Sequence, residues 1–139
     1  ALSAVKAGAL HVQGTFLGFG ERCGNANLSS IIADLQLKMN IDTGCDLTRL
    51  TATARQIAEI ANVRLDEGMP YVGLSSFAHK AGMHVDAVLK DSHTFEHVLP
   101  ESVGNEQRLV LSDVSGRSAV SHKLYALFPD LDKPRPRKY

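Results

Sequence analysis

The chain has 139 residues, of which 44% are hydrophobic and 22% charged, and its fifteen basic residues balance its fifteen acidic ones. Such a length and composition are typical of one soluble globular domain with a core of its own. The balanced charge excludes a global attraction to nucleic acid or membrane, and no apolar run approaches the roughly 20 residues of a membrane span.

The first half of the chain predicts helices separated by short connections. Residues 2–9 read as the end of a helix that Gly8 terminates, and the chain opens in mid-helix without a starting Met, so we expect a piece of something longer. Alternating apolar residues predict a short strand at 10–16. Apolar residues at helical spacing predict amphipathic helices at 27–39 and 47–62, the first capped by Asn25 or Asn27.

The second half is expected to be more mixed. Residues 66–73 read as a loop, and a short helix is predicted at about 82–90. The segment 95–116 looks extended, with its best strand at 108–114, and 116–128 returns to helix. Residues 129–139 form a basic, proline-rich tail. Cys23 and Cys45 have neither metal-type nor disulfide spacing, which favours a reducing cytosol and a cytoplasmic protein.

Between the predicted strand and the helix at 27–39 lies "GFGERCGNANL", residues 18–28, called the glycine-rich loop below. Strand, glycine-rich loop and helix is the arrangement that aims backbone N–H groups at an anion. Two common versions are excluded here. The P-loop ending Gly-Lys-Ser/Thr is absent, and the dinucleotide fingerprint would need glycine where Cys23 stands.

Asn25 has two interpretations. Its side-chain oxygen would suit a hard divalent cation, and at the end of a strand it would face an α/β active site. Alternatively, Asn25 only caps the following helix while Glu21 pairs with an arginine elsewhere. The residues by themselves leave both interpretations open.

Three stretches together resemble the citramalate synthase and 2-isopropylmalate synthase family, which are metal-dependent acyl-CoA carboligases on a TIM barrel. They are "HVQGTFLGFGERCGNANLSSIIADLQLKM", "YVGLSSFAHKAGMHVDAVLK" and "PESVGNEQRLVLSDVSGRSAV", in family order up to about residue 122. "GERCGNANL", "FAHKAGMHV" and "SDVSGRS" look closest to the citramalate synthase-like branch.

The resemblance implies a Claisen-type condensation of acetyl-CoA with a 2-oxo acid, with pyruvate giving citramalate. It also implies a bound divalent metal (Zn, Mn or Mg) and a homodimer. Asn25 matches the family's asparagine metal ligand, whereas the family's other ligands, an aspartate and two histidines, belong upstream of this chain. The chain is therefore expected to be inactive alone, since one asparagine cannot hold a catalytic cation.

Four further residues have roles by resemblance. His84 matches a family histidine that assists proton transfer, while Glu21 is a weaker catalytic candidate. Arg22 and Arg117 are candidates for binding coenzyme A. Many relatives have a tyrosine where this chain has Phe95, which has no hydroxyl to donate.

The expected parent is an α/β TIM barrel, and the chain itself an incomplete fragment of mixed helix and strand in which helix predominates. We expect the last barrel units at 1–40, a linker helix at 41–68, a small α+β linker subdomain at 69–128 and the tail at 129–139. Two alternatives stay open: a fragment of a 2-isopropylmalate or homocitrate synthase, and a non-catalytic interaction or regulatory module derived from such an enzyme.

Overall fold

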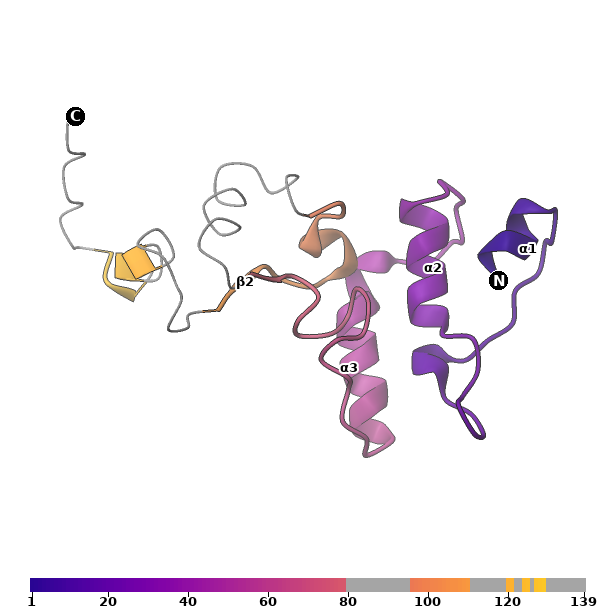
Figure 1. Cartoon of the computed structure of the whole chain (residues 1–139), viewed down its shortest axis with the longest axis horizontal. Helices are drawn as coiled ribbons and strands as arrows, with labels where there is room; N and C mark the ends of the chain where they lie inside the picture. Colours follow the sequence, from indigo (N-terminus) through magenta and orange to yellow (C-terminus); the bar gives the residue numbers. More distant parts are fainter. Residues whose placement is uncertain (80–95, 111–119, 122–123, 126, 130–139) are drawn as a thin grey trace. The chain divides into compact units, whose positions relative to one another are not determined.

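The computed structural model describes residues 1–79, 96–110, 120–121, 124–125 and 127–129 (Figure 1). The chain divides into two compact units. The first comprises residues 1–78 and 96–108, and the second comprises residues 79–95 and 109–139. The glycine-rich loop and most of the described hydrogen bonds belong to the first unit.

Three helices form most of the first unit: α1 (Leu2–Lys6), α2 (Leu28–Leu37) and α3 (Leu50–Ile60). Gly8 has a positive φ of 103° just past α1, which confirms the predicted end of that helix. The predicted helices at 27–39 and 47–62 are confirmed as α2 and α3, although α3 begins with a 3-10 turn, η2 (Leu47–Arg49).

The strand predicted at 10–16 is wrong. Only Thr15 pairs, in an isolated parallel bridge with Asn27, and it is followed by a 3-10 turn, η1 (Phe16–Gly18). A strand needs a neighbour to accept its backbone hydrogen bonds, and the described residues offer 10–14 none. Leu10, the first apolar residue of the expected alternation, is 101% exposed.

The extended segment predicted at 95–116 is interrupted by the 3-10 turn η4 (Pro100–Val103), which proline at its start favours. Within the described part of 108–114, the strand β2 covers only Arg108–Leu109, and it pairs with β1 (Ala78–His79), which the sequence pattern missed. Residues 66–73 are a loop, as predicted. The helix predicted at 82–90 and the tail from residue 130 lie outside the described residues.

Within the second unit, the described residues 120–121, 124–125 and 127 are helical, which agrees with the helix predicted at 116–128. The Phe128 N–H donates to the Leu124 carbonyl at 2.8 Å. In the described part of the chain, helix predominates over strand, which confirms the expected mixed composition of the fragment.

The core of the first unit gathers around α3. It is built from buried apolar side chains of η1, α2, η2, α3, η4 and the connecting segments, whereas α1 contributes none. These side chains are Leu17, Ala33, Leu47, Leu50, Ala54, Ala58, Val72, Phe77, Val98 and Val103. η1 contacts both α2 and α3, so the turn that begins the glycine-rich loop is held between two helices. The loop therefore starts from a fixed base.

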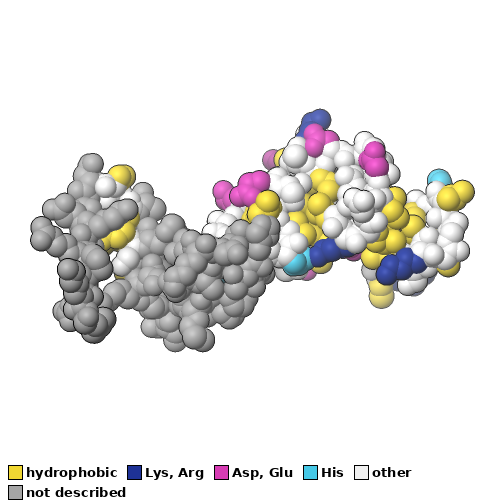
Figure 2. All heavy atoms as spheres, turned by 90° about the horizontal axis from the view of Figure 1, so that it is seen from above, with side chains coloured by type: hydrophobic (Ala, Val, Ile, Leu, Met, Phe, Trp, Pro, Cys, Tyr) yellow, Lys and Arg dark blue, Asp and Glu magenta, His cyan; other side chains and the backbone are white. Residues whose placement is uncertain are grey.

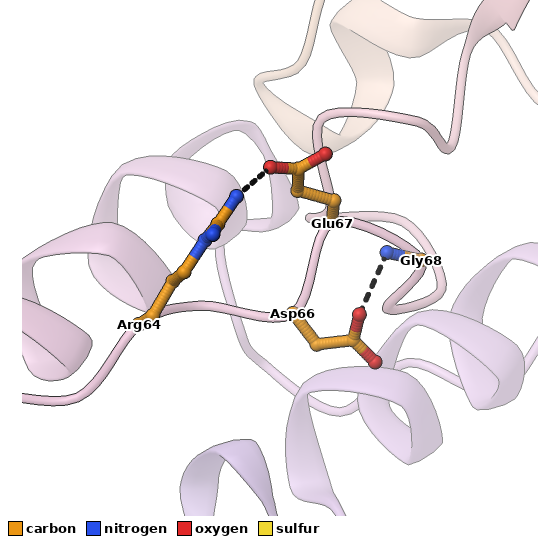
Figure 3. A network of polar contacts seen from close by, with 4 residues as sticks. All are labelled: Arg64, Asp66, Glu67 and Gly68. Carbon is orange, nitrogen blue, oxygen red and sulfur yellow. Dashed lines mark hydrogen bonds and ion pairs between the residues drawn. The ribbon is translucent and has the colours of Figure 1, made fainter.

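The connection from α3 to the next segment is a compact turn (Figure 3). The Asp66 carboxylate accepts a hydrogen bond from the Gly68 N–H at 2.9 Å, and Arg64 forms an ion pair with Glu67. Asx turns of this kind reverse the chain locally. After this turn, Met69 lies beside the start of α2, and the Met69 sulfur accepts a hydrogen bond from Asn27 Nδ2 at 3.6 Å.

Candidate functional site

The glycine-rich loop leaves Thr15 and returns to it. The Thr15 N–H donates to the Ala26 carbonyl at 3.0 Å, and the Thr15 carbonyl accepts from the Leu28 N–H at 2.9 Å. Inside this closure, the Asn25 N–H donates to the Gly18 carbonyl at 2.9 Å. The loop is thus a hydrogen-bonded reversal whose two ends meet where α2 begins.

Glycine is required where the loop crosses itself. Gly24 has a φ of 89°, and a Cβ there would overlap the Gly18 carbonyl oxygen. A Cβ on Gly20 would overlap the side-chain nitrogen of Asn25. The glycines at these two positions therefore permit close packing around Asn25.

The side chain of Asn25 is oriented by one backbone carbonyl. Asn25 Nδ2 donates to the Phe19 carbonyl at 2.8 Å, and the Thr15 hydroxyl donates to the same oxygen at 2.6 Å. Because a carbonyl only accepts hydrogen bonds, the amide nitrogen must face it. Asn25 Oδ1 accepts no hydrogen bond from the residues that the structure describes.

The helix cap is Asn27, which resolves the alternative that the sequence left open. Its Oδ1 accepts from the Ser29 N–H at 3.0 Å and from the Ser29 hydroxyl at 2.5 Å, at the first turn of α2. Asn25 therefore does not cap α2.

Glu21 and Arg22 lie on the outside of the loop and pair with each other. The Arg22 guanidinium is 3.5 Å from the Glu21 carboxylate, and both side chains are more than four-fifths exposed, at 86% and 90%. The partner of Glu21 is thus its sequence neighbour, not an arginine elsewhere. The Glu21 backbone also supports the loop, because its carbonyl accepts from the Gly24 N–H at 3.0 Å.

His84 and Arg117 lie outside the described residues, as does Phe95. Of the neighbouring histidines, His79 lies half-buried in β1, where its carbonyl accepts from the Val110 N–H at 2.9 Å. His97 is exposed. The candidate roles of His84 and Arg117 remain predictions.

Asn25 can supply one ligand atom, Oδ1, to a divalent cation. The side-chain amide presents a neutral oxygen of the kind that hard cations bind, and its nitrogen is already engaged. No group of three or more His, Cys, Asp or Glu side chains that would hold a metal occurs among the residues described. Further ligands would have to come from elsewhere.

Sequence reasoning missed a second polar contact, on the other side of α2. The Tyr71 hydroxyl donates to Asp34 Oδ1 at 2.6 Å, beside a hollow of about 370 Å³ lined in part by Ser30, Ser76 and His97. Burial raises the pKa of Tyr71 above its usual range, and the hydrogen bond and negative charge of Asp34 raise it further. Tyr71 is thus a firmly protonated donor. No sequence signal pairs the two residues, since they are 37 positions apart.

None of the helices that the structure describes has the length and apolar character needed to cross a membrane.

Two family models match the chain. Residues 1–57 match the HMGL-like family, and residues 71–135 match the family described as homocitrate synthase post-HMGL domain-like. The first range includes the whole glycine-rich loop, and the second includes His84 and Arg117.

The relatives agree with these matches. The chain is 50% identical over 137 residues to the (R)-citramalate synthase of Aquifex aeolicus, covering 97% of this chain and 26% of that protein. It is 49% identical over 139 residues to the (R)-citramalate synthase of Synechocystis, covering 97% of this chain and 25% of the relative.

A 2-isopropylmalate synthase from Cronobacter sakazakii is 39% identical over 128 residues, covering 89% of this chain and 24% of the relative. The chain thus spans about a quarter of the length of the curated relatives it matches. Over nearly its whole length, the chain resembles the citramalate synthase and 2-isopropylmalate synthase family, as its motifs predicted.

Proposed function

We propose that the complete protein containing this chain condenses acetyl-CoA with pyruvate to form citramalate, in branched-chain amino-acid biosynthesis. One observation supports this most directly. In "GERCGN", the side-chain nitrogen of Asn25 is engaged by the Phe19 carbonyl, which leaves Oδ1 for a cation. The similarity to citramalate synthases at 50% and 49% identity supports the choice of reaction.

The reaction has three steps. The methyl group of acetyl-CoA loses a proton, the resulting enolate attacks the keto carbon of the 2-oxo acid, and water cleaves the thioester to release coenzyme A. A bound divalent cation (Zn, Mn or Mg) would hold the 2-oxo acid and polarise the carbonyl under attack.

The residues of this chain take up the remaining tasks. Asn25 Oδ1 binds the cation, and His84 moves a proton on acetyl-CoA or on the thioester carbonyl. Arg22 and Arg117 bind coenzyme A, while Glu21 borders its entrance. The exposure of the Glu21–Arg22 pair, at 90% and 86%, supports a place for these two residues at an entrance.

The parent fold is a TIM barrel, and the protein is a cytoplasmic homodimer with no nucleic-acid or membrane partner. Residues 1–40 would contribute the last barrel units, 41–68 a linker helix, 69–128 the linker subdomain and 129–139 the tail. In this arrangement the chain alone is inactive, because it holds one of several metal ligands.

The test is release of coenzyme A by the complete protein, supplied with acetyl-CoA, a divalent cation and either pyruvate or 2-oxoisovalerate. We expect release with pyruvate, and loss of it in Asn25→Ala by at least about tenfold, typical of a disturbed metal site. The variant Cys23→Ala is the matched control, since Cys23 is exposed on the same loop.

Preference for 2-oxoisovalerate would move the assignment to 2-isopropylmalate synthase, which the Cronobacter relative supports at 39% identity. Absence of release with every 2-oxo acid would contradict the catalytic proposal. A non-catalytic module derived from such an enzyme would then be the better description.

A further inference from the structure

The Thr15 hydroxyl shares a hydrogen-bond acceptor with Asn25, the candidate metal ligand. It donates to the Phe19 carbonyl at 2.6 Å, and this carbonyl also accepts Asn25 Nδ2 at 2.8 Å. Thr15 forms no hydrogen bond with Asn25 in the described structure, so any influence on Asn25 passes through the shared acceptor. Geometrically, one carbonyl oxygen joins the two side chains.

A carbonyl oxygen has two lone pairs, and here both are used. The Thr15 hydroxyl occupies one direction, which leaves the other for the Asn25 amide. If Asn25 turned its amide over, Oδ1 would face the Phe19 oxygen, and two acceptors would meet without a proton between them. The carbonyl therefore selects the amide orientation in which Oδ1 is available.

The backbone of Thr15 is held by three hydrogen bonds to the two ends of the loop. The Thr15 N–H donates to Ala26 at 3.0 Å, and its carbonyl accepts from Gly18 at 3.1 Å and from Leu28 at 2.9 Å. Its hydroxyl is consequently a fixed reference point at the start of α2.

We propose that Thr15 is a positioning residue for the metal ligand Asn25, acting by fixing the Phe19 carbonyl that orients the Asn25 amide. The inference rests on the proposed function, in which Asn25 binds a divalent cation. It adds an outer hydrogen bond to the site, and outer-shell partners of metal ligands strongly affect metal affinity.

The experiment measures Mn²⁺ binding to the complete protein, from the free Mn²⁺ signal in electron paramagnetic resonance. Thr15→Val keeps the size and the extended backbone of Thr15, which has φ −128° and ψ 149°, but removes the hydroxyl. We expect the Mn²⁺ dissociation constant to rise about tenfold, at the lower end of outer-shell effects. Thr15→Ser retains the hydroxyl and should restore binding to within about twofold of the wild type, since the outer-shell hydrogen bond is preserved.

A purely structural role for Thr15 makes a different prediction. It would lower the melting temperature of the metal-free protein and leave Mn²⁺ affinity per folded molecule unchanged. That result would overturn the proposal. Should Thr15→Val fold poorly, the pair Thr15→Ser and Thr15→Ala repeats the comparison with smaller side chains.

Asn25→Ala distinguishes failure of the proposed metal ligand from failure of the positioning role of Thr15. If it leaves Mn²⁺ binding unchanged, Asn25 is not a ligand and the proposed function loses its support. If it weakens binding while Thr15→Val does not, only the positioning role fails. In the Asn25→Ala background, Thr15→Val should have no further effect, because its target is gone. Additive losses would contradict action through Asn25.

Discussion

Among single residues, the two asparagines on either side of Ala26 have opposite tasks. Asn27 points its oxygen at Ser29 and caps the start of α2, whereas Asn25 points its nitrogen at Phe19, and its oxygen accepts no hydrogen bond from the described part of the chain. The same type of side chain thus caps the helix in one place and, in the proposed function, binds a cation in the other. What differs is the backbone group that each amide meets.

Asn27→Ala should lower the free energy of unfolding by about 1 kcal/mol, the usual cost of a lost helix cap. The physical reason is that the Ser29 N–H at the start of α2 loses its acceptor. Urea unfolding followed by circular dichroism measures the change. Asn27→Ser is the matched control, since serine also caps helices and should retain most of the stability. Equal losses in both variants would place the effect in the Met69 contact instead.

At this scale the sequence predicted the types of residue better than their roles. The pattern identified Asn25, Asn27, Glu21 and Arg22, but it could not tell which asparagine capped α2. The deciding group is the Phe19 carbonyl, and backbone carbonyls have no signature in a sequence. Thr15 went unnoticed for the same reason, because its hydroxyl matters only through that carbonyl.

Among the elements, α2 is linked to distant parts of the chain by buried polar contacts. The Tyr71 hydroxyl reaches Asp34 of α2, while the buried Asn105 amide donates to the Tyr71 carbonyl at 2.8 Å. In the same unit, the buried Thr51 hydroxyl of α3 donates to the Val103 carbonyl at 2.7 Å. Residues 96–108 therefore pack in the same unit as residues 1–78, although residues 79–95 separate the two segments in the chain.

The predictable elements were those that need only local interactions. α2 and α3 follow from apolar spacing and capping, and both were predicted. The strand at 10–16 failed because a strand depends on a partner that local pattern cannot supply, and among the described residues only Asn27 pairs with it. β1 was missed for the converse reason, since two residues are too few to show alternation.

The Tyr71–Asp34 contact predicts a dependence of stability on alkaline pH. Because the folded state raises the pKa of Tyr71, the contribution is complete below the ordinary tyrosine value of 10.0 and is lost as pH rises above it. Wild-type melting temperature should therefore fall above pH 10.0 more steeply than that of Tyr71→Phe. At neutral pH, Tyr71→Phe should cost about 1 kcal/mol for the lost hydrogen bond.

The difference in absorbance at 295 nm between wild type and Tyr71→Phe reports the ionisation of Tyr71 alone. We expect this ionisation to begin only above the ordinary value of 10.0. Asp34→Asn is the control, because it retains an acceptor for the phenol but removes the negative charge. Ionisation of Tyr71 at its ordinary pKa in the wild type would refute the contact.

At the scale of the molecule, the first unit presents an apolar groove of about 580 Å³ between α1 and α2. It is lined mostly by aliphatic side chains, including Val5, Leu10, Val12, Leu28, Ile31, Ile32, Leu35 and Ile41. Apolar side chains are exposed across the first unit in Figure 2. Several belong to the apolar face of the helix predicted at 27–39, yet Leu28, Ile31 and Ile32 are only half-buried.

An apolar surface of this kind favours association in water. We expect the isolated 139-residue chain to form oligomers as its concentration rises, with the groove of one copy covered by another. Leu10→Lys should weaken this association, because Leu10 is 101% exposed at the groove and its replacement costs no core packing. Sedimentation velocity over a range of protein concentrations measures the effect.

Ile60→Lys is the matched control, since Ile60 is 78% exposed at the end of α3 and does not line the groove. Both variants add one positive charge, so a general electrostatic effect on association would appear equally in the two. Weakening by Leu10→Lys alone would locate the association at the groove. A chain that stays monomeric at every concentration would contradict the prediction.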